Sequence, residues 1–324
     1  MADTAEALVY TDVGRAEIRE VTLPPLSEGD VEVETLFSGL SRGTERLVHM
    51  GAVPEREWSR MRAPFQFGDF PFPVRYGYAA VGRVVAGPAE KVGQTVFALH
   101  PHQTRFRIPA DAAVALPDGV PPARAILAAN TETALNAIWD AALPPGARVA
   151  VIGAGLVGCL IAALLSRRTD LDLMLCDVIG ARRALALEIN VTFVEPTELP
   201  EDCVVAFHTS ASPAGLQSAL DCLTFEGRVI EVSWFGDHLV PVQLGGAFHA
   251  RRLQIISSQV GHVAAPRRAS TTHRDRLAAA LAALADPRLD NLITEDTRFR
   301  DLGEAIPRLL APDAPGIATR IVYD

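Results

Sequence analysis

Hydrophobic positions along the chain follow two different patterns. Before residue 115 the apolar segments are short and are separated by glycine and proline, which predicts β-strands. After a proline-rich segment at 117–122, strand-like apolar runs alternate with helix-like runs, which is typical of a parallel sheet with helices on both faces. The expected strands of the first part are Ala7–Tyr10, Val31–Phe37, Ala79–Val85 and Gln94–Leu99.

In the second part of the chain, the alternation of strand-like and helix-like runs predicts the bounds of each helix and strand. A helical period covers Ala123–Ala142, and a helix at Arg276–Ala285 and a strand at Ile317–Tyr323 are expected near the end. Between them, strands are expected at Arg148–Ile152, Leu171–Cys176, Val204–His208, Arg228–Val232 and Leu253–Ser257, and helices at Leu156–Arg167, Ala181–Ile189 and Pro213–Leu223.

Composition narrows the function class. The 324 residues predict two domains, and 49% hydrophobic residues are enough for a sizeable core. The net charge is −9 and the arginines are scattered, so no nucleic-acid partner is expected. The uncharged run at 149–166 contains three glycines and predicts a strand, a turn and a helix rather than a membrane span.

Two further counts bear on chemistry and location. Lys91 is the only lysine and lies in no Gly-Lys-Ser/Thr context, which excludes a phosphate-binding P-loop. The four cysteines have no C-x-x-C spacing and lie in apolar runs, so we expect buried thiols. With no signal peptide in the first residues, the sequence predicts a cytoplasmic protein.

A glycine motif predicts a dinucleotide site. A β-branched strand leads directly into G-x-G-x-x-G, a helix follows, and the next strand ends at Asp177. The carboxylate of Asp177 would bind the adenosine ribose and repel a 2′-phosphate, which favours NAD(H), whereas Arg182 and Arg183 leave NADP(H) open. The motif residues expected to contact the cofactor are Gly153, Gly155, Leu156, Val157 and Gly158.

Four segments give the chain a family resemblance: Ser38–Glu45, Gly77–Gly82, Val151–Gly158 and Phe299–Leu302. Together with the domain order, they resemble the medium-chain dehydrogenase/reductase superfamily. The resemblance implies an α/β fold with a GroES-like β-rich catalytic domain (1–120 and 258–324) and a Rossmann doubly wound parallel-sheet domain (121–257). It also implies a homodimer that pairs through the strand at Leu253–Ser257.

The departures from that superfamily concern its zinc ligands. In its zinc members the first segment carries a cysteine, where this chain has Ser41, and the second carries Gly-His-Glu, where this chain has Gly-Tyr78-Ala79. The third ligand is a cysteine where this chain has Ala129-Asn130, and no cysteine lies between Val96 and Phe106 for a structural zinc lobe. Because zinc sites are built from Cys, His or carboxylate, no zinc is expected.

Without a Lewis acid, the substrate oxygen needs another stabilising group. His100, which lines the substrate pocket in relatives, is the best acid/base candidate by ordinary pKa, or a lining residue only. Tyr78 could donate its phenolic proton or merely fill the space left by the metal. Ser41 and Thr44 supply further hydroxyls.

The remaining candidates are binding residues for a small-molecule substrate or for the cofactor. Arg42 could clamp an anionic substrate or contact the cofactor pyrophosphate, and Trp58 lies in an aromatic segment (Met50–Phe72) that suggests a large or flat substrate. Ser210 and Ser233 follow two strands of the nucleotide fold, where relatives meet the cofactor.

Three functions remain open at this stage. The first is a zinc-independent, NAD(H)-dependent interconversion of an alcohol and a ketone or aldehyde; Ser-Gly-x-Ser-x-Gly-Thr-Glu, followed by the turn Gly51–Pro54, is similar to a zinc-less subgroup that includes the bacteriochlorophyllide hydroxyethyl dehydrogenases. The second is an NADPH-dependent quinone or enone reductase. Asp177 argues mildly against it, because its carboxylate disfavours NADPH. The third is a non-catalytic NAD(H)-binding protein.

Overall fold

The computed structural model describes residues 3–324 and divides the chain into two compact units. The first contains the chain up to Ala129 together with Ile293–Asp324, and the second is Asn130–Leu292. No helix among the described residues is long and apolar enough to span a membrane.

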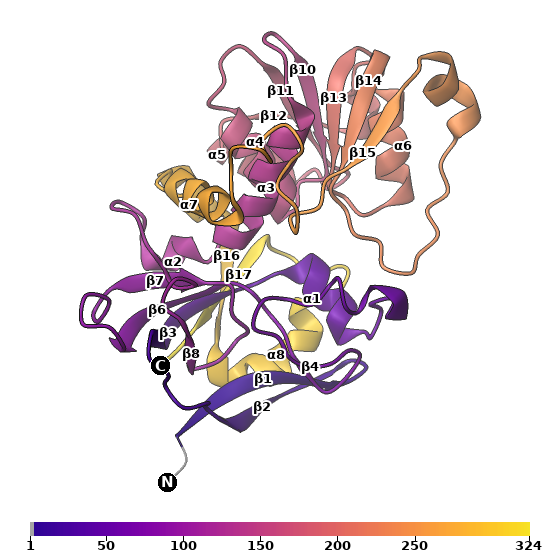
Figure 1. Ribbon diagram of the computed structural model, residues 1–324. Helices are drawn as coiled ribbons and strands as arrows, with labels where there is room; N and C mark the ends of the chain where they lie inside the picture. The colour runs from indigo at the N-terminus through magenta and orange to yellow at the C-terminus, as the bar shows by residue number, and fades with distance from the viewer. Residues whose placement is uncertain (1–2) are drawn as a thin grey trace. The chain divides into compact units, whose positions relative to one another are not determined.

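The first unit is built on two β-sheets. One has the strand order β2-β1-β5-β4, and the other has the order β16-β17-β3-β6-β7-β9 with β8 paired to β3 (Figure 1). Val31, Val33 and Phe106 belong to its buried apolar core. The strands are β1 (Thr4–Asp12), β2 (Arg15–Thr22), β3 (Asp30–Leu40), β4 (Phe67–Gly68), β5 (Val74–Arg75), β6 (Ala80–Ala86), β7 (Thr95–Ala98), β8 (Arg105–Pro109), β9 (Val114–Ala115), β16 (Ile293–Arg298) and β17 (Ala318–Val322).

Short helices connect these strands. Helix α1 (Arg42–His49) follows β3 directly, α2 is Pro122–Ala125 and α8 is Leu302–Leu309. Arg46 of α1 donates to the backbone oxygens of Leu310 and Ala311. These carbonyls lie at the C-terminal end of α8, where backbone oxygens lack partners within the helix. The end of the chain is therefore held by the helix that follows β3.

The second unit holds a six-stranded parallel sheet with the order β12-β11-β10-β13-β14-β15 (Figure 1). Counted along the chain this is 3-2-1-4-5-6, the order of dinucleotide-binding Rossmann domains. The direction of the strand order reverses between β10 and β13, so a crevice for a ligand is expected at their carboxyl ends. The strands are β10 (Arg148–Ile152), β11 (Asp172–Cys176), β12 (Thr192–Val194), β13 (Cys203–His208), β14 (Leu223–Glu231) and β15 (Gln254–Ser257).

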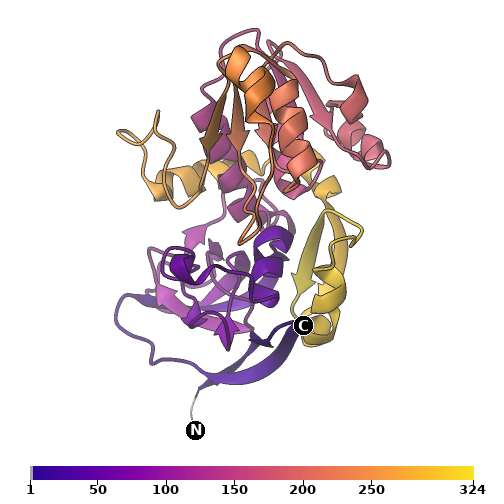
Figure 2. The ribbon, with the colours of Figure 1, turned by 90° about the vertical axis from the view of Figure 1, so that its right-hand side faces the viewer.

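Helices cover both faces of this sheet, as the two views show (Figures 1 and 2). The crossovers containing α4 and α6 leave the switch point in opposite directions, and right-handed crossovers then place them on opposite faces. Every residue of β10 after the first is buried, which suits a strand covered on both sides. The helices are α3 (Ala128–Ala141), α4 (Leu156–Leu165), α5 (Arg182–Glu188), α6 (Pro213–Asp221) and α7 (His273–Ala283).

The unit boundaries differ from the expected ones at 121 and 258. Residues 258–292 belong to the second unit, and one buried side chain explains why. Arg276 of α7 donates to Glu132 (2.9 Å) and Asn136 (2.6 Å) on α3. Because a buried guanidinium is costly unless it is paired, this network ties the segment after β15 to the second unit.

Candidate functional site

Three hydroxyl groups meet at the start of α1. The Tyr78 hydroxyl donates to Oγ of Ser41 at 2.5 Å, and it also hydrogen-bonds the side chain of Thr44. Ser41 follows the last residue of β3 and is the N-cap residue of α1, and Tyr78 lies just before β6. Burial raises the pKa of Tyr78 to about 12, so its phenol stays protonated and can donate at neutral pH. Three of the predicted catalytic residues are thus brought together.

A fully buried polar network lies beneath this cluster. Glu45 accepts from the Ser41 backbone N–H (2.7 Å) and from the Tyr10 hydroxyl (2.7 Å). The imidazole of His102 bridges Glu45 (3.0 Å) and Oγ of Ser38 (2.8 Å). Glu45 thereby anchors Ser41, an orienting role consistent with its place in the Ser-Arg-Gly-Thr-Glu segment.

His100, which was expected to act as an acid/base group because of its ordinary pKa, is held in an aromatic stack. It is buried and stacks on Phe106 with ring centroids 4.0 Å apart, while its Nδ1 lies 3.0 Å from the Pro101 carbonyl. Burial lowers the pKa of His100 to about 3, so the imidazole is neutral at pH 7 and holds no imidazolium proton to donate. Sequence alone could not show this, because it gives the residue type and not the aromatic stack.

The two expected substrate residues are engaged by their own unit. The guanidinium of Arg42 donates to the carbonyls of Ala314 (2.9 Å), Pro315 (2.8 Å) and Gly316 (3.3 Å). The indole N–H of Trp58 donates to the Val53 carbonyl at 3.0 Å. Arg42 therefore secures the segment before β17, and Trp58 stabilises a local turn.

In the second unit, the glycine turn has the geometry that the motif predicted. Gly153 has φ +110°, and a Cβ there would lie 2.7 Å from the backbone nitrogen of Ser210. A Cβ on Gly158 would lie 1.9 Å from the Gly153 carbonyl oxygen. Both glycines are therefore required for close packing of backbone on backbone.

Gly155 is different, because a Cβ there would meet nothing within 4 Å. It is the N-cap of α4, and no side chain caps that helix. An open helix start with its N–H groups and positive dipole end suits a pyrophosphate. Leu156 and Val157 form the first turn beside it.

Asp177 lies directly after β11 and reaches back to the glycine turn. Its Oδ2 accepts from the Ala154 N–H at 2.6 Å and its Oδ1 accepts from the Ile179 N–H at 2.8 Å. A carboxylate has about four acceptor positions, so two remain for ribose hydroxyls. The cradle and this carboxylate together fit a dinucleotide.

Ser210 and Ser233 lie at the carboxyl edge of the same sheet. Oγ of Ser233 accepts from the Ala211 N–H at 3.1 Å. Oγ of Ser210 lies 2.8 Å from Nε2 of His208, whose Nδ1 lies 2.8 Å from a carboxylate oxygen of Glu231. The sequence pattern did not single out Glu231. The available signal was that two strands end in ionisable side chains, one in His208 and the other in Glu231.

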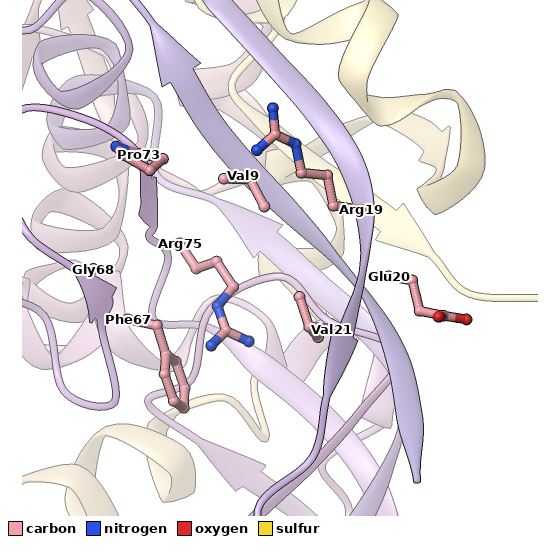
Figure 3. A pocket seen from close by; sticks show the side chains of 8 residues that line it. All are labelled: Val9, Arg19, Glu20, Val21, Phe67, Gly68, Pro73 and Arg75. Atoms are coloured by element: carbon pink, nitrogen blue, oxygen red, sulfur yellow. The ribbon is translucent and has the colours of Figure 1, made fainter. Parts of the chain in front are cut away.

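A shallow hollow of about 330 Å³ on the first unit is separate from these residues (Figure 3). The guanidinium of Arg75 lies 3.6 Å from the centre of the Phe67 ring there. None of the predicted site residues lines it. Its lining consists of Val9, Arg19, Glu20, Val21, Phe67, Gly68, Pro73 and Arg75.

The grouping of side chains bears on metal binding. Within residues 3–324, no three His, Cys, Asp or Glu side chains are grouped so that they could hold a metal ion. The hydroxyls of Ser41 and Tyr78 are bonded to each other, and serine and tyrosine are outside the usual ligand set of protein zinc.

No protein-family model matches the sequence. Among solved structures, the chain is similar over 100% of its length, and 99% of the other chain, to L-idonate 5-dehydrogenase of Escherichia coli, with TM-score 0.80 and 16% identity. An E. coli alcohol dehydrogenase in complex with NADH gives TM-score 0.78 and 15% identity over 99% and 100% of the two chains. A Sinorhizobium meliloti structure described as a zinc-binding dehydrogenase and bound to NADP gives TM-score 0.78 and 16% identity over 99% of each chain. At this identity the likeness establishes the fold, which is the expected combination of a β-rich unit and a Rossmann unit.

Proposed function

We propose that this chain is a zinc-independent, NAD(H)-dependent oxidoreductase that interconverts an alcohol and a ketone or aldehyde. The observation that carries the proposal is the open, uncapped start of α4 at Gly155, with Asp177 bonded to the same turn. The fold supports it, because similar structures were solved with NADH and with NADP. The nicotinamide would supply or accept the hydride.

The residues of this chain divide the work between the two units. Gly153, Gly155 and Gly158 shape the turn that would hold the pyrophosphate, and Asp177 would accept from the ribose hydroxyls. Its negative charge supports NAD(H) over NADP(H), since a 2′-phosphate would lie against a carboxylate. Ser210 and Ser233, at the switch point of the sheet, complete the proposed cofactor contacts.

In the first unit, Tyr78 would act on the substrate oxygen. When a ketone is reduced, the developing alkoxide needs a proton, and the neutral phenol of Tyr78 would donate it in place of its hydrogen bond to Ser41. Ser41 and Thr44 hold that phenol by hydrogen bonds, so its orientation is set before the substrate arrives. In the direction of oxidation, the same hydroxyl would accept the proton back.

Zinc independence is supported by the chemistry of the donors. Hydroxyl groups replace the cysteine and histidine that zinc members carry in the two corresponding segments, and they are bonded to each other rather than arranged around a common point. The proposal is tested by measuring turnover after exhaustive dialysis against a chelator. Unchanged turnover is expected, and loss that added zinc restores would refute this part.

The cofactor assignment is tested by fluorescence titration with NADH and NADPH in parallel. Tight NADH binding with weaker NADPH binding is the expected result. A panel of secondary alcohols and ketones, followed by NADH absorbance, then identifies the reaction. Reduction of quinones or enones with no alcohol oxidised would select the reductase alternative, and binding without any turnover would select the non-catalytic one.

The proposal also covers the oligomeric state of the protein and its location in the cell. The edge strand β15 presents Ile255 at 39% exposure, which supports a homodimer formed by pairing this edge. All four cysteines are buried free thiols, which supports a reducing, cytoplasmic location. Sedimentation equilibrium tests the first, since material of 34.7 kDa alone would exclude a dimer.

A further inference from the structure

Three side chains at the carboxyl edge of the parallel sheet form a continuous hydrogen-bonded chain. Glu231 ends β14, His208 ends the neighbouring strand β13, and Ser210 lies two residues further on. The carboxylate oxygens of Glu231 lie 2.9 and 2.8 Å from Nδ1 of His208, and Oγ of Ser210 lies 2.8 Å from Nε2. This is a carboxylate, imidazole and hydroxyl in the order in which serine hydrolases use them.

The neighbouring donors fix the direction of the protons. Glu231 also accepts from the Ser233 N–H at 2.8 Å, and because its carboxylate oxygens are acceptors, the tautomer of His208 that bonds them carries its proton on Nδ1. Nε2 is then an acceptor, and Ser210 must donate to it. On the far side, Oγ of Ser212 lies 3.0 Å from Oγ of Ser210 and itself accepts from the Gly215 N–H. The proton of Ser210 therefore points at a base.

The backbone presents Ser210 outward while the base stays buried. His208 is fully buried and Ser210 is exposed, at a sharp turn from strand β13 into helix α6. The next residue, Ala211, has φ +50°, a strained conformation for a residue with a Cβ. Such strain is concentrated at functional sites.

Gly215, in the first turn of α6, leaves the room that the pair needs. A Cβ at that position would lie 2.1 Å from Oγ of Ser210 and 3.1 Å from Nε2 of His208. The start of α6 is therefore directly beside the Ser210 hydroxyl. Phe235 lies on the other side of the imidazole, with ring centroids 6.0 Å apart and planes at 22°.

We propose that Ser210 is an activated nucleophile and that the chain hydrolyses small carboxylic esters at this position, independently of hydride transfer. Glu231 orients the imidazole, His208 is the general base, and Ser210 attacks. The proposal goes beyond the proposed oxidoreductase and does not rest on it, because none of the participating groups is a redox group. Ser210 is also one of the proposed cofactor contacts, so ester hydrolysis and labelling are measured on the chain without NAD(H).

The reaction balances without a co-reactant other than water. The Ser210 hydroxyl proton moves to Nε2 of His208 as its Oγ bonds the ester carbonyl carbon. The ester C–O bond then breaks, and the leaving alcohol takes the proton from His208. Water next gives a proton to His208 and attacks the acyl group, which releases the carboxylic acid as the proton returns to Ser210.

The tetrahedral intermediate needs a donor for its negative oxygen. In the first turn of α6, the N–H groups of Gly215 and Leu216 are bonded to Ser212, and Pro213 has none. The N–H of Ala214 has no acceptor within the helix by helix geometry, and it lies in the turn that adjoins Ser210. Together with the dipole of α6 it is the donor we assign to the oxyanion.

This chain makes a covalent-labelling experiment unusually clean. Lys91 is the only lysine, and all four cysteines are buried, so amines and thiols hardly compete with serine for an electrophile. The first probe is a fluorophosphonate. The full chain is labelled with it and then digested, and the site of attachment is mapped by mass spectrometry of the peptides. The second probe is p-nitrophenyl acetate, whose hydrolysis is followed by absorbance.

We expect the wild-type chain to be labelled at Ser210, and Ser210→Ala to abolish both labelling and hydrolysis. His208→Gln, which keeps the size and hydrogen-bonding groups, should slow both by about 100-fold, the usual contribution of a general base. Glu231→Gln should slow both by about tenfold or more, because the imidazole loses its charged partner. The matched control is Ser218→Ala on α6, whose hydroxyl only contacts the Ala214 carbonyl of its own helix, and it should behave as wild type.

Two results would overturn the proposal. One is a wild-type labelling map in which Ser210 carries no phosphonate. The other is labelling of Ser210 as fast in His208→Gln and Glu231→Gln as in wild type, which would make it an ordinary exposed hydroxyl. Thermal unfolding of each variant is measured in parallel, and if His208→Gln does not fold, Glu231→Gln and the wild-type map decide.

Discussion

The carboxylate of Glu45 and the imidazole of His102 lie 3.0 Å apart, and neither side chain is accessible to solvent. Each side chain also has a further hydrogen bond. Glu45 accepts from the Ser41 N–H, and the imidazole of His102 is bonded to Oγ of Ser38. Buried polar groups are tolerated when their hydrogen-bonding capacity is satisfied in this way. The pair therefore fixes the junction between β3 and α1, on which the hydroxyl cluster depends.

Removing this carboxylate should be costly. Glu45→Ala leaves the Tyr10 hydroxyl, the His102 imidazole and the Ser41 N–H without their shared acceptor, and we expect a loss of about 3–5 kcal/mol in the free energy of unfolding. Urea unfolding measures it. Glu55→Ala, at an exposed position of the short helix Glu55–Glu57, is the control and should change stability by less than about 0.5 kcal/mol. Equal midpoints for the two variants would contradict the role given to Glu45.

The burial of His100 predicts an acid-sensitive term in stability. Its folded pKa, lowered to about 3 by burial, lies below the ordinary histidine value of about 6.5. Between these two pKa values the imidazole is protonated in the unfolded state and neutral in the folded state. The free energy of unfolding therefore decreases as pH falls below about 6.5. From pH 7 to pH 5 this one group should contribute a loss of about 2 kcal/mol.

His100→Phe tests that term, because phenylalanine keeps the stack on Phe106 and cannot bind a proton. Urea unfolding at pH 7 and pH 5 should show a smaller loss for the variant than for wild type, with other titrating groups common to both. Parallel stability losses in the two proteins would mean that His100 is protonated in the folded state. His238, which is exposed, provides the control variant His238→Phe.

Tyr78→Phe separates proton transfer from cofactor binding. The proposed acid is removed while the ring stays, so kcat for ketone reduction should fall by about 100-fold, and the Kd for NADH should not change. Tyr76→Phe is the matched control: its hydroxyl also lies in the first unit, 3.4 Å from the Met61 carbonyl, and is not bonded to Ser41. Wild-type turnover in Tyr78→Phe would return the residue to a space-filling role.

The parallel-sheet half of the fold could be predicted closely, because its central strands β10 and β13 are mostly buried and therefore form continuous apolar runs. Arg148–Ile152 was expected and found with the same bounds. Strand β2 was missed, because Arg15–Thr22 is half charged and mostly exposed. Strand β16 was missed for the same reason, since Ile293–Arg298 has one apolar residue and every second residue of it is exposed.

The candidate site was predictable where a motif constrains the backbone and less so where packing decides. Gly153 and Gly158 were identified by spacing, and their close contacts follow from the same backbone constraint. Arg42 was expected to be available to a substrate, but its guanidinium is held by the carbonyls of Ala314–Gly316, more than 270 residues away along the chain. Contacts of that range are set by tertiary packing, which a local pattern does not contain.

The last prediction concerns the choice of cofactor and isolates the charge of Asp177 from its structural contact. Asp177→Asn keeps an oxygen that can accept from the Ala154 N–H, so the glycine turn should persist while the negative charge is lost. The Kd for NADPH should then fall and that for NADH should rise, changing their ratio by about tenfold, or about 1.4 kcal/mol. Asp172→Asn is the control, because this exposed carboxylate at the first residue of β11 is paired with Arg148 instead, and its ratio should equal that of wild type. An unchanged ratio in Asp177→Asn would show that Asp177 only supports the turn, and the preference would then have to come from Arg182 and Arg183.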